Sequence, residues 1–295
     1  MRILLTGATG QVGWELARTL LPVGEVMAVD RSQADLADLN SLRAIIQRHK
    51  PDVIVNPAAY TAVDKAETEQ ELAFLINAEA PGVMAEEAKK IGALLVHYST
   101  DYVFDGTKNT PYTEDDATNP INVYGQSKLA GEQAIQSVGG DFLILRTSWV
   151  YASRGNNFLK TILRLAAERE ELKIVADQIG SPTWARLIAE TTAHIVRQAL
   201  LEKQANRFNS GIYHLTSTGD TSWHGFAQQI VDSVREQGKV ALKNKSIYPI
   251  PTIDYPLPAK RPTNSRLSTR RLEQQFGLTM PSWDNALRLC MQETV

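Results

Sequence analysis

Residues 1–30 constrain the fold of this chain more than any other stretch. An apolar run at 3–5 leads into a glycine-rich stretch at 7–13, and a second apolar run, at 26–29, ends at Asp30. Between the two runs, apolar residues recur at helical spacing. The order strand, glycine turn, helix, strand and acid is typical of a nucleotide-binding α/β unit.

The glycine turn predicts a dinucleotide site. Gly7, Gly10 and Gly13 let backbone amides approach a pyrophosphate, and the start of the following helix favours its negative charge. An acid about 20 residues further on suits a ribose hydroxyl, and Asp30 holds that place. Arg31 follows it and suits a 2′-phosphate instead, so NADH and NADPH are both open.

Further alternation of strand and helix extends this unit. Apolar runs typical of buried strands follow at 52–56, 93–98 and 142–146. Such alternation predicts a doubly wound parallel sheet of the Rossmann-like α/β class. We expect a dinucleotide-binding domain over 1–150, rejoined by about 184–216. We expect a smaller, mostly α-helical substrate domain made of 151–183 and 217–295.

Ligands of open parallel sheets collect where the strands end. The segment 99–101, Ser-Thr-Asp, follows one strand, and its hydroxyl groups suit a substrate oxygen or simply a turn. Trp149 follows the next strand, as a flat wall for a ring or as a core aromatic. Asp35 suits either the adenine or a capping role. Arg261, in a basic turn, suits a diphosphate or a plain surface position.

Tyr124 and Lys128 stand four residues apart, on one face of a predicted helix. A nearby ammonium favours the phenolate, so we expect Lys128 to lower the pKa of Tyr124. Such a phenol gives or takes a proton at a carbonyl or alcohol oxygen. A solvated surface pair has the same spacing, and the reactive interpretation gains its weight from the nucleotide turn and from Thr100.

Composition excludes several other classes of protein. The net charge of −2 gives no reason to expect binding to nucleic acid or membrane surfaces, and we see no apolar run of membrane-spanning length. A single cysteine, Cys290, excludes an internal disulfide and suggests a reducing cytoplasm. The five histidines show no metal-ligand spacing.

Three motifs resemble those of the extended short-chain dehydrogenase/reductase family: Gly7-x-x-Gly10-x-x-Gly13, Ser99-Thr100-Asp101 and Tyr124-x-x-x-Lys128. Within it, the stretches 10–13, 60–67, 97–104, 124–132 and 146–151 resemble the family of dTDP-4-dehydrorhamnose reductases. This resemblance implies NADPH- or NADH-dependent reduction of the C4 keto group of dTDP-4-dehydro-L-rhamnose to dTDP-L-rhamnose, a precursor of bacterial surface polysaccharide.

The resemblance also implies residue roles. Tyr124 would donate the proton, Lys128 would bind the nicotinamide ribose, and Thr100 would hold the sugar carbonyl oxygen. Asp101 and Trp149 would contact the substrate. The residues implied for the cofactor are Gly10, Gln11, Val12, Asp30, Asp35, Leu36, Ala59, Tyr60, Thr61 and Tyr98.

The family is also described with Mg²⁺ and with metal-linked homodimers, which use Glu15 and a second acid. Arg186 stands at the corresponding second position, and an arginine does not ligate a cation, so the metal and that homodimer are in doubt here. Two alternatives stay open. One is another nucleotide-sugar 4-epimerase or dehydratase, although Tyr102 stands where dehydratases place a glutamate. The other is a non-catalytic, nucleotide-binding regulatory subunit.

Overall fold

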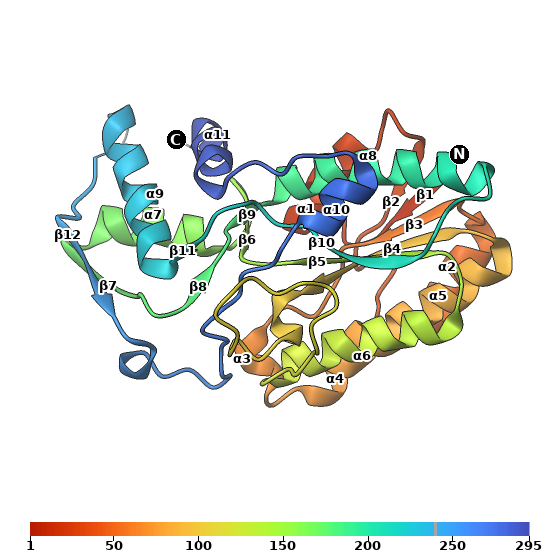
Figure 1. Ribbon diagram of the computed structural model, residues 1–295, viewed down its shortest axis with the longest axis horizontal. Helices are drawn as coiled ribbons and strands as arrows, with labels where there is room; N and C mark the ends of the chain where they lie inside the picture. The colour runs from red at the N-terminus through yellow and green to blue at the C-terminus, as the bar shows by residue number, and fades with distance from the viewer. Residues whose placement is uncertain (239–240, 295) are drawn as a thin grey trace.

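Six parallel strands form the central sheet of this computed structural model, which describes residues 1–238 and 241–294 (Figure 1). Their order is β10-β5-β4-β3-β1-β2. The strands are β1 (Arg2–Leu5), β2 (Glu25–Ala28), β3 (Val53–Asn56), β4 (Leu94–Thr100), β5 (Phe142–Thr147) and β10 (Gly211–His214). Helices cover both faces, so the predicted doubly wound α/β class is confirmed.

The two faces of the sheet build two cores because successive side chains of a strand point to opposite sides. Ile3 and Leu5 of β1 join the core under α1 (Gln11–Thr19), α8 (Ala185–Gln204) and α10 (Arg270–Phe276). Leu4, between them, joins the core under α2 (Leu39–His49), α5 (Ala80–Ile91) and α6 (Val123–Val138). α10 therefore packs on the sheet although it lies late in the chain.

A second group of elements packs beside the sheet at the other end of the molecule (Figure 1). Its core contains Tyr151, Phe226 and Leu287, all fully buried. Its helices are α7 (Phe158–Glu168), α9 (Trp223–Gln237) and α11 (Trp283–Thr294). Three short ladders join β7 (Glu171–Val175) to β12 (Ser246–Ile250), β8 (Ile179–Gly180) to β11 (Thr221–Ser222), and β6 (Val150–Tyr151) to β9 (Thr183–Trp184).

Side-chain caps fix the starts of two helices that the sequence predicts. The sequence predicts Asn122 as the cap of α6, and the structure confirms it, because the Asn122 side chain accepts from the Gly125 N–H at 2.7 Å. For α2 the sequence offers two caps, Asp38 and Asn40, and the structure shows that Asp38 caps the helix by accepting from the Ser41 N–H. Within the described ranges, no helix is long and apolar enough to cross a membrane.

The remaining described elements are short helices and turns. They are α3 (Val63–Ala66), α4 (Gln70–Phe74), the π-helical turn η1 (Leu75–Glu79), and the 3₁₀ turns η2 (Asp101–Val103) and η3 (Thr252–Asp254). The sequence predicts one long helical region up to Ile91, and the structure divides it into α4, η1 and α5. η1 thus interrupts the regular hydrogen bonding directly beside α6.

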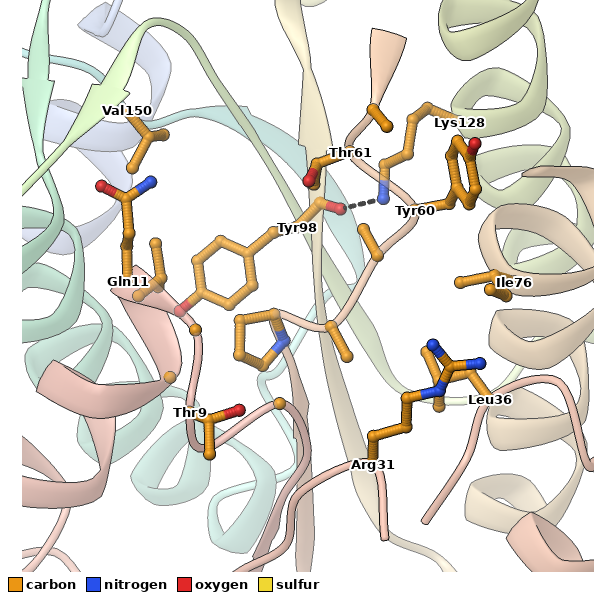
Figure 2. A pocket seen from close by; sticks show the side chains of 18 of the residues that line it. Thr9, Gln11, Arg31, Leu36, Tyr60, Thr61, Ile76, Tyr98, Lys128 and Val150 are labelled. Atoms are coloured by element: carbon orange, nitrogen blue, oxygen red, sulfur yellow. Dashed lines mark hydrogen bonds between the residues drawn. The ribbon is translucent and has the colours of Figure 1, made fainter. Parts of the chain in front are cut away.

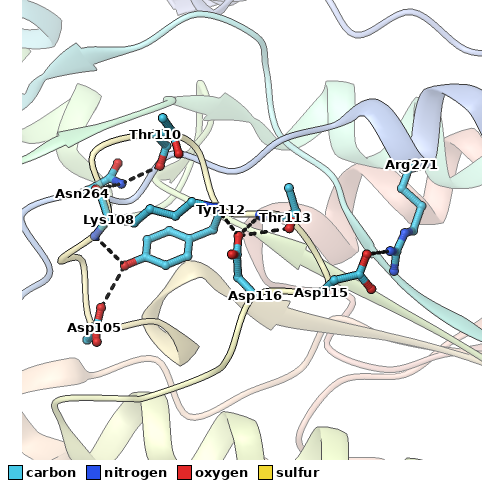
Figure 3. Close-up of polar contacts among 9 residues, drawn as sticks. All are labelled: Asp105, Lys108, Thr110, Tyr112, Thr113, Asp115, Asp116, Asn264 and Arg271. Atoms are coloured by element: carbon cyan, nitrogen blue, oxygen red, sulfur yellow. Dashed lines mark hydrogen bonds and ion pairs between the residues drawn. The ribbon is translucent and has the colours of Figure 1, made fainter.

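The polar loop that follows η2 is held by its own carboxylates (Figure 3). Asp105 accepts from the Thr107 N–H and the Tyr112 hydroxyl, and these bonds lower its pKa. Asp116 accepts from Lys108 and from the Thr113 N–H. The loop is therefore a fixed part of the molecule rather than a loose connection.

Candidate functional site

A cavity of about 580 Å³ opens at the carboxyl ends of the central strands (Figure 2). Gly7, Pro57, Ser99 and Thr147, at or just after the ends of β1, β3, β4 and β5, all line it. The predicted cofactor residues that line it are Gly7, Gly10, Gln11, Val12, Gly13, Arg31, Asp35, Leu36, Ala59, Tyr60, Thr61, Tyr98, Tyr124 and Lys128. Asp30 does not appear among its lining residues.

The glycine turn leaves room for a phosphate group at the start of α1. Gly7 has a φ of +58°, a conformation that favours glycine. A Cβ on Gly13 would lie 2.0 Å from the Gly7 carbonyl oxygen, so only glycine lets α1 start this close to the turn. α1 has no side-chain cap, which leaves its first N–H groups and its positive end suited to an anion.

Arg31, not Asp30, faces the cavity at the end that Leu36 lines, away from Lys128 (Figure 2). The Asp30 carboxylate accepts from the N–H and the hydroxyl of Ser32, which lower its pKa and occupy its Oδ1. The Arg31 side chain is 77% exposed and pairs with Asp35 at 3.1 Å. An exposed ion pair of this kind contributes little free energy, so the guanidinium can leave Asp35 and bind a phosphate at little cost.

A buried amide fixes the loop that follows β3. Asn77, in the π-helical turn η1, accepts from the Tyr60 N–H at 2.9 Å and donates to the Tyr60 carbonyl at 3.0 Å. It also donates to the Ser127 hydroxyl on α6. The loop residues Tyr60 and Thr61 are thereby tied to the helix that carries Tyr124.

Lys128 is almost fully buried, at 2% exposure, and its ammonium is held from the sheet side. Nζ donates to the Tyr98 carbonyl oxygen at 2.6 Å (Figure 2). It also lies 3.2 Å from Nε2 of His97. Burial lowers the pKa of Lys128 to about 8, while the charge of Glu132 acts to raise it. The lysine is thus charged at neutral pH but near its titration range.

His97 links Lys128 to two polar side chains in the interior of the sheet. Its Nδ1 lies 3.1 Å from the Asn56 amide, and the Thr6 hydroxyl donates to Asn56 at 2.6 Å. Burial and the Lys128 charge hold the pKa of His97 well below its usual value, so the ring is neutral. As the amide lies, its nitrogen faces Nδ1 and its oxygen accepts from Thr6. Nε2 accepts from the charged lysine when this amide is turned over, so that Nδ1–H donates to the Asn56 oxygen and the Asn56 nitrogen donates to the Thr6 hydroxyl.

Tyr124 faces the same cavity, with its ring edge-on to Tyr102 at 5.7 Å between centroids. Burial raises its pKa to about 12, the Asp101 charge adds to this, and a hydrogen bond with Thr100 opposes it. The expectation that Lys128 lowers the pKa of Tyr124 is therefore wrong here, because burial outweighs it and the ammonium is turned to His97. The phenol stays protonated at neutral pH.

Thr100 and Asp101 lie where β4 passes into η2, and both are buried. The Thr100 hydroxyl accepts from the Tyr102 N–H at 3.1 Å and donates to Asp101 Oδ1 at 3.0 Å. Burial raises the pKa of Asp101 to about 7, and the nearby hydroxyl groups of Ser265 and Thr100 act to lower it. Neither residue lines the 580 Å³ cavity itself.

The other two predicted substrate residues also lie outside that cavity and have partners. Trp149, at φ +47°, stacks on Trp223 with ring centroids 3.6 Å apart, so one of its faces is covered. Arg261 pairs with both oxygens of Asp64, at 3.0 and 2.8 Å. Asp64 already binds the guanidinium through two parallel hydrogen bonds, so a diphosphate would have to displace this carboxylate.

The place that the family resemblance assigns to a metal does not fit one in this chain. Arg186 donates to Glu15, whose side chain is 4% exposed, at 3.2 Å, and also to Glu293. The guanidinium thus neutralises the carboxylate that a cation would need. Residues 1–238 and 241–294 hold no group of three or more His, Cys, Asp or Glu side chains placed for a metal ion.

Sequence reasoning passes over several residues that build the site. The five histidines show no metal-ligand spacing, so the sequence predicts a structural or surface position for His97, and it points to no role for Asn77 or Asn56. A signal existed for His97 and Asn56, because each is a polar residue within an otherwise apolar strand run. Asn77 gave no such signal, because the π-helical turn that aims it is not visible in the sequence.

Comparison with known proteins gives a consistent result over the whole chain. The family model described as "RmlD substrate binding domain" matches residues 1–295. A dTDP-4-dehydrorhamnose reductase of Burkholderia thailandensis is 56% identical over 294 residues, covering 99% of both chains. A protein of that name from Salmonella typhimurium is 48% identical over 297 residues, covering 99% of this chain and 98% of the relative.

A solved structure supports the same assignment. The dTDP-4-dehydrorhamnose reductase of Bacillus anthracis, in complex with NADP, superposes with a TM-score of 0.88 at 37% identity. The match covers 99% of each chain. This chain is therefore similar, in sequence and in fold, to proteins named dTDP-4-dehydrorhamnose reductase.

Proposed function

This chain belongs to the RmlD substrate-binding-domain family, and from that premise we propose that it reduces the C4 keto group of dTDP-4-dehydro-L-rhamnose to give dTDP-L-rhamnose. It is a nicotinamide-dependent oxidoreductase of the short-chain dehydrogenase/reductase type. The observation that carries the proposal is that Tyr124, Lys128 and the glycine turn line one cavity.

The cavity residues fit a dinucleotide. The glycine turn and the uncapped start of α1 suit its pyrophosphate, and Lys128 suits the nicotinamide ribose hydroxyls as a fixed donor. When bound, the reduced nicotinamide supplies the hydride that reduces the C4 carbonyl carbon. The remaining work belongs to side chains of this chain.

Tyr124 delivers the proton to the C4 oxygen, and Thr100 donates a hydrogen bond to that oxygen as its negative charge develops. The pKa of about 12 keeps the phenol protonated, which is the form that a proton donor needs. A positioned acid of this kind accelerates a reaction by roughly 10² to 10⁴. Asp101, Trp149 and Arg261 are placed on the substrate side as part of the same proposal.

We also propose NADPH as the preferred cofactor. Arg31 lines the cavity with an exposed, weakly paired guanidinium, whereas Asp30 is occupied by Ser32. A 2′-phosphate would gain a cation at this place, whereas Asp30, the acceptor that a ribose hydroxyl would need, does not line the cavity.

The sequence-based domain division, the cytoplasmic location and a homodimer remain part of the proposal. The proposed substrate domain is 151–183 and 217–295. Within it α10 packs on the sheet, and the rest would hold the sugar nucleotide beside the sheet. A homodimer in this chain would not use a metal bridge at Glu15, because Arg186 already neutralises that side chain.

The experiment that tests the function is an NADPH-oxidation assay against a panel of 4-keto nucleotide sugars, with the product configuration at C4 determined by NMR. The proposal expects stoichiometric conversion of dTDP-4-dehydro-L-rhamnose to dTDP-L-rhamnose. Tightly held cofactor with no net oxidation would favour the epimerase or dehydratase alternative. Nucleotide binding without turnover on any sugar would favour the regulatory subunit.

A further inference from the structure

Asp101 is a buried carboxyl beside the reacting groups, and contact with the sugar does not explain its surroundings. It is 3% exposed, and its Oδ2 is buried with no hydrogen-bond partner among the described residues. A buried carboxylate with an unpaired oxygen is costly, and the cost falls when the group takes up a proton. The burial that raises its pKa to about 7 reflects this.

The Thr100 hydroxyl has one proton and two lone pairs to distribute. One lone pair accepts from the Tyr102 N–H at 3.1 Å. Its oxygen also lies 3.0 Å from Asp101 Oδ1. An ionised Asp101 only accepts, so it takes the single Thr100 proton, and Thr100 then has none left for a substrate oxygen.

A protonated Asp101 reverses this hydrogen bond. The carboxylic acid donates to the second lone pair of Thr100. The O–H bond of Thr100 then points toward Tyr124 and the substrate. We propose that Asp101 is a positioning residue whose protonation turns the Thr100 hydroxyl from the carboxylate toward the C4 carbonyl oxygen. This inference rests on the proposed reductase function and adds a pH-dependent gate to it.

The cations near Asp101 are paired with other groups and do not stabilise its carboxylate. Lys128 is committed to the Tyr98 carbonyl and His97, and Arg261 to both oxygens of Asp64. The polar and titratable groups that face or influence this carboxyl are Thr100, Tyr102, Tyr124 and Ser265. The ionised form of Asp101 is therefore stabilised by hydroxyl groups alone, because both nearby cations are paired with other groups.

The test is the pH dependence of kcat/KM for dTDP-4-dehydro-L-rhamnose at saturating NADPH, in the wild-type protein and in Asp101→Asn. In the wild type the rate should fall about tenfold per pH unit above pH 7, because only the protonated acid is productive. In Asp101→Asn the amide nitrogen donates to Thr100 at every pH. The ratio of the rate at pH 6 to the rate at pH 8 should be about 20 in the wild type and about 2 in Asp101→Asn. The remaining factor of about 2 comes from the titration of Lys128.

A second readout does not depend on turnover. Infrared difference spectra of the wild-type protein with NADP⁺ bound should show a protonated-carboxyl band that titrates near pH 7 and is missing in Asp101→Asn. A residue that only supports the fold would move neither the pH limb nor this band.

Two results would overturn the inference: a wild-type rate that is flat between pH 6 and pH 8, or an equal fall in Asp101→Asn. A wild-type protein that oxidises no NADPH at any pH would instead remove the proposed function, while the infrared titration would still decide the state of Asp101. Should Asp101→Asn fail to fold, the wild-type pH limb and band remain decisive.

Discussion

Tyr124 and Lys128 do not act on each other as their spacing suggests. The lysine is turned to His97 and the Tyr98 carbonyl, and the phenol keeps a pKa of about 12. The spacing correctly predicts one helix face and one cavity. It does not predict the pKa, because burial depends on residues such as Tyr102 that pack against the phenol from another element.

His97 supplies the first prediction at this scale. In His97→Leu, the Lys128 ammonium loses a hydrogen-bond acceptor. Its charged form is then less stable, so the pKa of Lys128 should fall below the value of about 8. A hydrogen bond to a charged group is worth about 1.5–3 kcal/mol, or about one to two pH units. NADPH affinity, measured by fluorescence against pH, should therefore begin its alkaline fall one to two units earlier than in the wild type.

The matched control is His97→Gln, whose amide oxygen can take the place of Nε2 as an acceptor. It should restore most of the wild-type pH dependence. If His97→Leu and the wild type lose affinity at the same pH, the histidine does not hold the lysine charge.

Arg31 supplies the second prediction. In Arg31→Ala, the affinity for NADPH should fall about tenfold or more, because a charge-assisted bond to a phosphate is lost. The affinity for NADH should change less than about twofold. Isothermal titration with both cofactors measures the difference. An equal loss for the two would mean that Arg31 does not contact a 2′-phosphate.

At the scale of elements, α6 can approach η2 only because residue 125 is glycine. A Cβ there would lie 2.2 Å from the Tyr102 carbonyl oxygen. Gly125→Ala should therefore push α6 away from Thr100, lower the free energy of unfolding by about 1–3 kcal/mol and reduce kcat. Urea denaturation and turnover measure the two effects.

Gln126→Ala is the control for this substitution, because Gln126 is exposed on the same helix turn. It should leave both quantities near the wild type. A Gly125→Ala variant with normal stability and turnover would show that the helix does not need this close approach.

The sequence predicts elements well where a local cause sets them. The apolar runs give the sheet strands, and Asn122 gives the start of α6 through its own side chain. It does not predict the π-helical turn η1, because the surrounding residues keep a helical pattern. The turn is set by packing against α6, where a Cβ on Gly131 would meet the Asn77 carbonyl oxygen at 2.1 Å.

At the scale of the whole molecule, several contacts join residues far apart in the chain. Asp64 pairs with Arg261, and Glu15 pairs with Arg186. Composition and periodicity cannot predict such pairs, because they depend on how the second group of elements sits against the sheet. The position of Arg261 was therefore open from the sequence, and the structure gives it a carboxylate partner.

The Glu15–Arg186 pair carries a prediction about metal dependence. Because the guanidinium neutralises Glu15, the NADPH-oxidation rate and the sedimentation coefficient should be unchanged by EDTA and by added Mg²⁺. The control is Arg186→Glu, which restores an acid and should make one of the two quantities sensitive to Mg²⁺. A wild-type rate that EDTA abolishes would show a metal requirement that this arrangement does not explain.

The central claim is that the Tyr124 phenol gives the proton to a ketone held in the cavity of the glycine turn. The most direct measurement is single-turnover oxidation of bound NADPH by dTDP-4-dehydro-L-rhamnose in the wild type and in Tyr124→Phe. The account predicts a rate at least about a hundredfold lower in the variant, with NADPH affinity unchanged. A Tyr124→Phe rate close to that of the wild type would contradict it.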